Sequence, residues 1–388
     1  MIVKEKLNQA IEILNDLKID MWLIFCREST TIPDPSIPLV VGHNIVGQSA
    51  FLITKNGDTI AIVSGYDAAD FINSGVYKEV ISYKESISDE LLQKLYQHNP
   101  GTIAINYSKG SVSADGLTHG MYLLLTEYLT DTPYLNKLVS AEKILFSVRG
   151  RKNRFEIDHL KKAAVIADQC WHMSIPMIEP GMTEIQIAAL IANNLQKLGS
   201  RNSFNPIVNA GAKTSPGHGS PTDAVLEEGD LLHIDFGALV EGYCSDIQRV
   251  AYFRRKGEIS PPEPLLRAFD KIKSIIDVTS KEYKTGALGF EIDGIARKML
   301  RDNGYEEYNH CLGHQIGREV HDGASLVGPS WKRYGEAPRI PLEANNTFTA
   351  ELGISLPGIG YVSLEEDLMV TDEGGVFLGP RQTELIIK

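Results

Sequence analysis

The later part of this 388-residue chain contains a weak internal repeat, which favours a fold built from two similar halves. Pro180-Gly181 leads into a helical stretch that ends at Gly199, and Gly286 leads into a second that ends at Gly304. Both Gly-to-Gly intervals span 18 residues. Apolar residues recur in register inside the two intervals, Ile187 with Ile292 and Leu195 with Leu300. Thr183 and Gln186 predict a capping box at the start of the first helix.

Each helical stretch is followed by a segment with the pattern of an acidic hairpin. In the first, LLHIDFGALVEGYCSDIQRVAYF, a turn centred between Val240 and Glu241 places Asp235 directly opposite Asp246. Their Cβ atoms then lie about 5 Å apart on one sheet face. Two such carboxylates repel each other unless a cation lies between them. The alternative is that one of them points outward in a twisted hairpin.

The second hairpin, FTAELGISLPGIGYVSLEEDLMV, repeats the arrangement with glutamates. A turn centred on Gly358 places Glu351 opposite Glu365, and strand alternation points Glu366 to the other face. Hard oxygen ligands bind divalent cations. Four carboxylates from two similar halves therefore predict a site for more than one metal ion.

Histidines lie between and before these hairpins. His310, His314 and His321 stand among glycines in HCLGHQIGREVHD, and His218 stands in the polar loop SPGHGSPTD. Any one of them alone is more often structural or simply solvated. Beside four carboxylates, the group is typical of one ligand imidazole together with catalytic imidazoles.

The first part of the chain alternates strand and helix patterns and predicts a mixed α/β accessory domain. Asn56-Gly57-Asp58 predicts a hairpin turn, because Asn-Gly tolerates positive φ. Charges become dense from Ser147 onward, and we place the domains at 1–140 and 141–388. Strands are predicted over residues 21–26, 51–54, 59–63 and 102–106, and a helix over 116–129.

Composition excludes some classes of protein. The net charge of −12 disfavours nucleic-acid binding, which depends on clustered Lys and Arg. The N-terminal 20 residues mix charges with apolar residues at helical spacing, unlike a signal peptide. No segment approaches the ~18 apolar residues of a membrane span. Four scattered cysteines without a C-x-x-C pair fit a reduced compartment, so we expect a cytoplasmic protein with no nucleic-acid or membrane partner.

Six ordered motifs, spread over the C-terminal part, resemble those of a known superfamily: EPGMTE, NPIVNAG, GHGSPTD, IDFGALVEGYCSD, GHQIGREVHD and AELG…SLEEDLMVT. They are similar to motifs of the pita-bread metallopeptidases, which include Xaa-Pro dipeptidases (prolidases), aminopeptidases P, methionine aminopeptidases and creatinase. The resemblance implies an α+β protein, with a creatinase/prolidase-like N-terminal α/β domain before a pseudo-twofold pita-bread catalytic domain. It also implies a small peptide substrate and a homodimer.

The same resemblance implies a site with two divalent metal ions. Its five ligands match Asp235, Asp246, His314, Glu351 and Glu365, with Asp246 and Glu365 bridging the two ions. A hydroxide bridging the metals is then the nucleophile, and Glu351 is the candidate proton shuttle. His218 and His321 match histidines that bind the scissile amide and stabilise its tetrahedral intermediate, and His310 matches a histidine near the substrate. Four carboxylates and one imidazole accept Mn²⁺, Co²⁺, Zn²⁺ or Fe²⁺.

Several residues depart from the family pattern. Ser363 stands where prolidase-like members carry Arg, and serine cannot form a bidentate clamp on a substrate carboxylate. Arg318 or Arg381 is a candidate substitute. Further departures are Leu352, Gly217, Gln315 and Cys311. We therefore expect a peptidase that hydrolyses Xaa-Pro bonds, with two alternatives: a hydrolase or lyase for a small C–N metabolite, and a catalytically inert metal-binding module.

Overall fold

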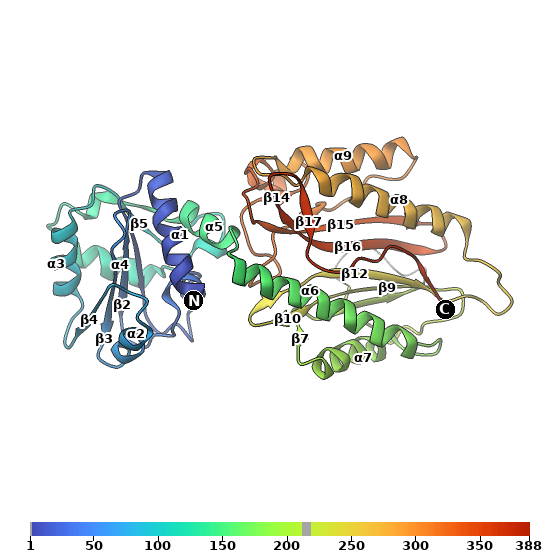
Figure 1. Cartoon of the computed structure of the whole chain (residues 1–388), viewed down its shortest axis with the longest axis horizontal. Coiled ribbons are helices and arrows are strands. Elements are labelled where there is room, and N and C mark those ends of the chain that lie inside the picture. The colour runs from blue at the N-terminus through green and yellow to red at the C-terminus, as the bar shows by residue number, and fades with distance from the viewer. Residues whose placement is uncertain (1, 212–218) are drawn as a thin grey trace. The chain divides into compact units, whose positions relative to one another are not determined.

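A computed structural model describes residues 2–211 and 219–388. The chain divides into two compact units, Met1–Arg149 and Gly150–Lys388, which we call the N-terminal and C-terminal units (Figure 1). Each is described by itself. The predicted fold class is confirmed, since helices and strands are mixed in both units. Among the described helices, none is both long enough and apolar enough to span a bilayer.

The N-terminal unit is built on a six-stranded mixed sheet of order β4-β3-β2-β1-β5-β6. β1 and β2 pair antiparallel, as do β2 and β3, whereas the outer pairs are parallel. Every residue of β1 to β3 is buried, because helices cover both faces of the sheet. The strands are β1 (Met21–Cys26), β2 (Ser49–Thr54), β3 (Thr59–Ser64), β4 (Glu79–Tyr83), β5 (Ile103–Ile105) and β6 (Leu138–Ser140). The helices are α1 (Ile2–Leu17), α2 (Ala68–Ser74), α3 (Ser88–His98), α4 (His119–Tyr128) and α5 (Glu142–Gly150).

The structure confirms the hairpin around Asn56-Gly57-Asp58, where Gly57 adopts a φ of 94°. The helix predicted from residue 116 begins later, at His119. The Thr118 hydroxyl accepts a hydrogen bond from the Met121 N–H and so caps the helix there.

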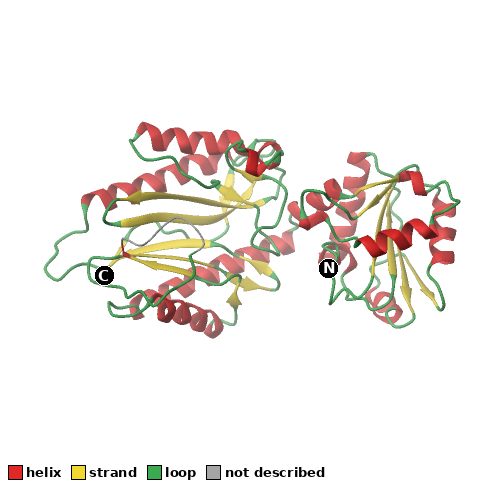
Figure 2. Ribbon diagram, turned by 180° about the vertical axis from the view of Figure 1, so that it is seen from behind, coloured by secondary structure: helices red, strands yellow, loops and turns green. Residues whose placement is uncertain are grey.

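The C-terminal unit places one large sheet between two helix pairs. The sheet runs β15-β16-β12-β9-β8, with β17 added beside β16 and β18 beside β12. In Figure 1 these strands lie between the pair α8–α9 and the pair α6–α7, and Figure 2 shows the same layers from behind. The helices are α6 (Arg154–Ser174), α7 (Glu184–Lys197), α8 (Glu263–Thr279) and α9 (Gly289–Asp302).

The strands of this unit include those that form the acidic hairpins. They are β7 (Arg201–Asn202), β8 (Ile207–Ala210), β9 (Leu231–Phe236), β10 (Ala238–Val240), β11 (Tyr243–Cys244), β12 (Ile247–Tyr252), β13 (Gly313–His314), β14 (Leu326–Val327), β15 (Thr347–Leu356), β16 (Gly360–Val370), β17 (Gly375–Phe377) and β18 (Ile386–Ile387).

The internal repeat corresponds to two similar halves. Both repeat helices, α7 and α9, have 14 residues, and Thr183 and Gln186 form the predicted capping box on α7. The Gly181 N–H donates to the Leu226 carbonyl at 2.8 Å, and the Gly286 N–H donates to the Leu342 carbonyl at 2.7 Å. The four repeat glycines, Gly181, Gly199, Gly286 and Gly304, all have positive φ. The repeat therefore extends from the helices to their connections.

The two repeat helices pack in different apolar cores. Ile187 and Leu195 of α7 pack in a core with β8, β9 and β12, whereas Ile292 and Leu300 of α9 pack in another with α8, β15 and β16. The two halves meet where β12 pairs with β16, with Gln248 opposite Glu365. Side chains from both hairpins consequently converge at the centre of one sheet.

Candidate metal centre

The first acidic hairpin differs from its predicted register. Glu241 and Gly242 form a two-residue turn, with φ of 51° and 79°, so Asp235 pairs with Gln248 and not with Asp246. The predicted turn centre between Val240 and Glu241 was therefore wrong by one residue. Asp246 lies just before β12, diagonal to Asp235. Because side chains alternate with a period of two, this shift leaves both carboxylates on the same face, and the two contact each other.

The second hairpin has the predicted register. Glu351 of β15 pairs directly with Glu365 of β16, and the connecting loop centres on Gly358, whose φ is 75°. Glu366 points to the other face, where it accepts a hydrogen bond from Arg249 at 3.0 Å. The strand alternation predicted for this segment is thus confirmed.

A cavity of about 380 Å³ in the C-terminal unit collects the predicted polar residues. Its walls include all four hairpin carboxylates and His314. None of the described residues that line it is a lysine or an arginine. The lining residues are Phe204, His233, Asp235, Asp246, Gln248, Tyr308, His310, Cys311, His314, Val320, His321, Tyr334, Glu351, Tyr361 and Glu365.

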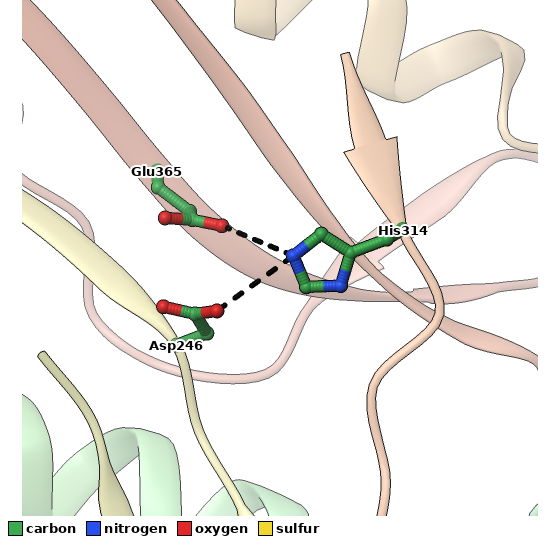
Figure 3. Close-up of side chains that lie close together, drawn as sticks. All are labelled: Asp246, His314 and Glu365. Carbon is green, nitrogen blue, oxygen red and sulfur yellow. Dashed lines mark ion pairs between the residues drawn. The ribbon is translucent and has the colours of Figure 1, made fainter. Parts of the chain in front are cut away.

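The tightest group in the cavity is Asp246, His314 and Glu365, whose nearest ligand atoms all lie within 4.8 Å of one another. His314 Nε2 lies 3.7 Å from Asp246 Oδ2 and 3.9 Å from Glu365 Oε1, and it points between the two carboxylates (Figure 3). Its Nδ1 lies 3.3 Å from the Gln315 carbonyl. A donor bond there leaves Nε2 as the ring nitrogen that can bind a metal.

Burial makes this group of carboxylates costly to ionise. It raises the pKa of Asp235 to about 7 and that of Glu351 to about 8. The pKa values of Asp246 and Glu365 rise well above their usual range, first through burial and then through repulsion by neighbouring carboxylates. One buried oxygen of Asp235 and one of Asp246, Oδ1 in each, has no hydrogen-bond partner. Divalent cations would satisfy these oxygens and offset the repulsion, so the residues present fit a metal centre.

Two of the three histidines predicted to act on the substrate, His321 (catalytic) and His310 (substrate-binding), lie among the described residues. His321 packs against His314 with ring centroids 4.4 Å apart, and His310 packs against Tyr308 at 5.5 Å. Both line the cavity. His218 lies outside the residues that the structure describes. The roles of all three remain predictions.

Two cavity residues that contact the glutamates were missed from the sequence. Gln248 Nε2 donates to Glu365 Oε2 at 2.8 Å and to Glu351 Oε2 at 3.2 Å, and the Tyr308 hydroxyl lies 3.4 Å from Glu351 Oε2. Strand alternation could have identified Gln248, which follows Asp246 by two residues and so shares its face. No local pattern marks Tyr308, because its loop is positioned only by tertiary contacts.

Ser363 and its two candidate substitutes, Arg318 and Arg381, have structural partners, whereas Gly217 lies outside the residues that the structure describes. Ser363 is buried, and its hydroxyl donates to Gln248 Oε1. Arg318 donates to the Tyr243 hydroxyl at 3.2 Å, and Arg381 forms an ion pair with Asp277 at 2.7 Å. Neither guanidinium lines the cavity. Cys311 does line it, and burial raises the pKa of its thiol well above the usual range.

Comparison with known proteins gives consistent matches along the chain. The model of metallopeptidase family M24 matches residues 158–372. An Xaa-Pro dipeptidase of Pyrococcus horikoshii is 27% identical over 387 residues, covering 99% of both chains. The solved Xaa-Pro dipeptidase of Bacillus anthracis is 27% identical with a TM-score of 0.76, covering 99% of both chains. The X-Pro aminopeptidase of Thermotoga maritima is 26% identical with a TM-score of 0.73, covering 98% of this chain and 99% of the other.

Proposed function

This chain belongs to metallopeptidase family M24, and we propose that it hydrolyses Xaa-Pro bonds of dipeptides or short peptides with two divalent metal ions. The observation that carries this proposal is the convergence of four carboxylates and the His314 imidazole on a single cavity without a lysine or an arginine among its described lining residues. The proposed ligands are Asp235, Asp246, His314, Glu351 and Glu365.

Metal ions held by these residues supply Lewis acidity and an activated water nucleophile at neutral pH. The protein then has to move protons and stabilise charge around the reacting carbonyl. Glu351 is our candidate proton shuttle, since its Oε2 accepts bonds from Gln248 and Tyr308 while the carboxylate faces the cavity. His321, beside His314, would donate to the developing oxyanion. His218 would contact the amide being cleaved, and His310 would contact the substrate.

The cavity walls suit a proline side chain. Phe204, Tyr308, Tyr334 and Tyr361 surround the polar group with aromatic surface. A pyrrolidine ring is apolar and rigid, so it can pack on such rings at little entropic cost. Two of the relatives named above differ in substrate, one being a dipeptidase and the other an aminopeptidase. Both dipeptides and longer peptides that begin Xaa-Pro are therefore candidate substrates.

A second candidate function is cleavage of a C–N bond in a small metabolite, by a hydrolase or a lyase reaction. It is favoured by Ser363, which bonds Gln248 at the position where prolidase-like members carry an arginine. Neither Arg318 nor Arg381 replaces that arginine in the cavity wall. A free dipeptide carboxylate would then lack its usual partner from the described residues of this chain.

The two candidates are separated by a cleavage assay on metal-free protein reconstituted with Mn²⁺, Co²⁺, Zn²⁺ or Fe²⁺. The substrates are Xaa-Pro dipeptides, longer peptides that begin Xaa-Pro, and matched Xaa-Ala peptides. We expect cleavage of at least one Xaa-Pro series, with Xaa-Ala cleaved at least about tenfold more slowly, the factor that corresponds to 1.4 kcal/mol. Failure to cleave either Xaa-Pro series with every metal would overturn the peptidase proposal.

We also expect a homodimer of this chain. Light scattering coupled to size exclusion should give twice the 42.8 kDa chain mass. A monomeric mass in an active preparation would contradict this expectation.

A further inference from the structure

Gln248 occupies the position where the two halves of the C-terminal unit join. It lies on β12 and pairs with Asp235 of β9 on one side and with Glu365 of β16 on the other. Its side chain is 7% exposed and lines the cavity that holds the acidic hairpins. The carboxamide is therefore beside both carboxylate pairs.

Every hydrogen-bonding position of this carboxamide has a partner. Its Nε2 donates one hydrogen bond to Glu351 Oε2, at 3.2 Å, and another to Glu365 Oε2, at 2.8 Å. Its oxygen accepts from the Ser363 hydroxyl and lies 3.0 Å from His233 Nε2, which donates in the tautomer protonated there. A primary amide has two donors and two lone pairs, so the side chain is held in one orientation.

That orientation decides which carboxylate oxygens remain for a metal. Gln248 holds Oε2 of Glu365, whereas Oε1 of the same residue lies 3.9 Å from His314 Nε2. In Glu351, Oε2 is again the oxygen that is held, by both Gln248 and Tyr308. A neutral donor fixes the two glutamates without adding charge to a crowded acidic group, which a further carboxylate could not do.

We propose that Gln248 is a positioning residue that sets the coordinating oxygens of Glu351 and Glu365, and that Ser363 and His233 fix the orientation of its carboxamide. This inference rests on the proposed metal-binding function. It gives Ser363 a role as a support for Gln248 in place of a substrate clamp. Groups that orient metal ligands commonly contribute about 10- to 100-fold to metal affinity.

The test compares two buried glutamines. Gln382 is also 7% exposed, and its carboxamide bonds the backbone of Val250 and Glu384 without contacting the acidic cluster. Gln248→Leu and Gln382→Leu each remove a buried carboxamide whose nitrogen and oxygen are both hydrogen-bonded. Metal-free samples of both are titrated with Mn²⁺ by calorimetry, with thermal melting as a check of folding. We expect about 10- to 100-fold weaker binding in Gln248→Leu and a change within about twofold in Gln382→Leu.

Bound Co²⁺ provides a second measurement, because its visible absorption reports ligand geometry. We expect the spectrum to change in Gln248→Leu and to match wild type in Gln382→Leu. A folded Gln248→Leu variant with wild-type Mn²⁺ affinity and an unchanged Co²⁺ spectrum would overturn the inference. If wild type itself binds neither ion, the proposed function fails, and the inference fails with it.

Ser363→Ala keeps the test decisive if Gln248→Leu does not fold. It removes one bond to Gln248 Oε1, and we expect roughly three- to tenfold weaker Mn²⁺ binding, less than for direct removal of the amide. Ser355→Ala, at an exposed position of β15, is the matched control and should bind Mn²⁺ as wild type does. Wild-type affinity in Ser363→Ala would contradict the role given to that serine.

Discussion

The two acidic hairpins follow the two copies of the internal repeat, but they hold their carboxylates differently. Asp235 and Asp246 are diagonal neighbours, and one oxygen of each has no hydrogen-bond partner. Glu351 and Glu365 are directly opposite, and one oxygen of each is held by Gln248. The difference begins in the turns, a two-residue turn in the first hairpin and a loop centred on Gly358 in the second. Similar halves can thus supply one metal centre with two kinds of carboxylate pair.

The largest expected effect should distinguish Glu351, which we propose binds metal and moves protons, from Asp235, which we propose only binds metal. Glu351→Gln should lower kcat by at least about 10³-fold, because it removes both a proposed metal ligand and the proposed proton shuttle. Asp235→Asn should also lose activity, but excess Mn²⁺ should restore part of it, since only metal affinity is impaired. Steady-state rates on Xaa-Pro peptides across a Mn²⁺ series measure both.

Circular dichroism must show that both variants stay folded. Activity of Glu351→Gln within tenfold of wild type would remove that residue from its assigned role. Equal recovery of the two variants with excess Mn²⁺ would mean that the two hairpins do not differ in this way.

The connection between the hairpins is tested at Arg249, which is fully buried and bonds the Glu366 carboxylate and the Glu365 carbonyl. Arg249→Leu leaves the Glu366 charge buried without its partner and should cost about 3–5 kcal/mol of unfolding free energy. Urea denaturation of the metal-free protein measures this cost. Adding Glu366→Leu to the variant should recover part of it, because the unpaired charge is then removed. A single variant as stable as wild type would show that the halves do not depend on this pair.

The crowded carboxylates predict how the stability of the metal-free protein depends on pH. The folded-state pKa values of Asp235 and Glu351 are raised to about 7 and about 8, from usual values of 3.8 and 4.5. The folded state therefore binds more protons than the unfolded state between about pH 4 and pH 8, and stability falls as pH rises through that window. We expect the melting temperature to drop by roughly 5 °C or more across it.

Saturating Mn²⁺ should flatten this dependence at its upper end, because the ions replace the protons, and Mn²⁺ affinity should weaken as the pH falls below about 7. Differential scanning fluorimetry over a pH series, with and without Mn²⁺, measures both effects. A metal-free protein that becomes more stable toward pH 8 would contradict the assigned pKa directions.

The smallest expected effect concerns the turns themselves. Gly242→Ala places a side chain at a φ of 79°, and its Cβ would lie 3.1 Å from Arg318 Nη2. Gly358→Ala has a similar φ of 75°, but its Cβ would meet no atom within 4 Å. The positive φ should lower the free energy of unfolding by about 1 kcal/mol in each variant. Gly242→Ala should lower it somewhat further, because of the contact with Arg318. Equal decreases in melting temperature would show that the Arg318 side chain moves aside without an energetic cost.

Periodic and local signals accounted for much of the fold. The 18-residue glycine intervals predicted the paired halves, and the alternation around Glu351 and Glu365 predicted their register. In the N-terminal unit, the run Met21–Cys26 and the Asn-Gly turn predicted a strand and a hairpin. The strand and the hairpins are encoded in short segments, so local backbone preferences determine them, whereas the paired halves follow from the recurrence of one such segment along the chain.

The first hairpin shows where local reasoning ends. Asp235 pairs with Gln248 and not with the predicted Asp246, because the turn centre lies one residue further along the chain. Glu241 and Gly242, which both have positive φ, form the turn there. The face of the carboxylates was still predicted correctly, because the register moved by a multiple of the strand period.

By itself, the sequence determined the repeat and the acidic character of both hairpins, since both are carried by spacing along the chain, and its ordered motifs indicated the fold class through their resemblance to a known superfamily. Only the tertiary structure decided that Gln248 bonds Glu351 and Glu365, that Ser363 supports it, and that Tyr308 reaches Glu351. Those contacts join β12, β15, β16 and a loop that are separated by up to 117 residues. No periodicity connects such positions. They meet because β12 of one half and β16 of the other pair at one point.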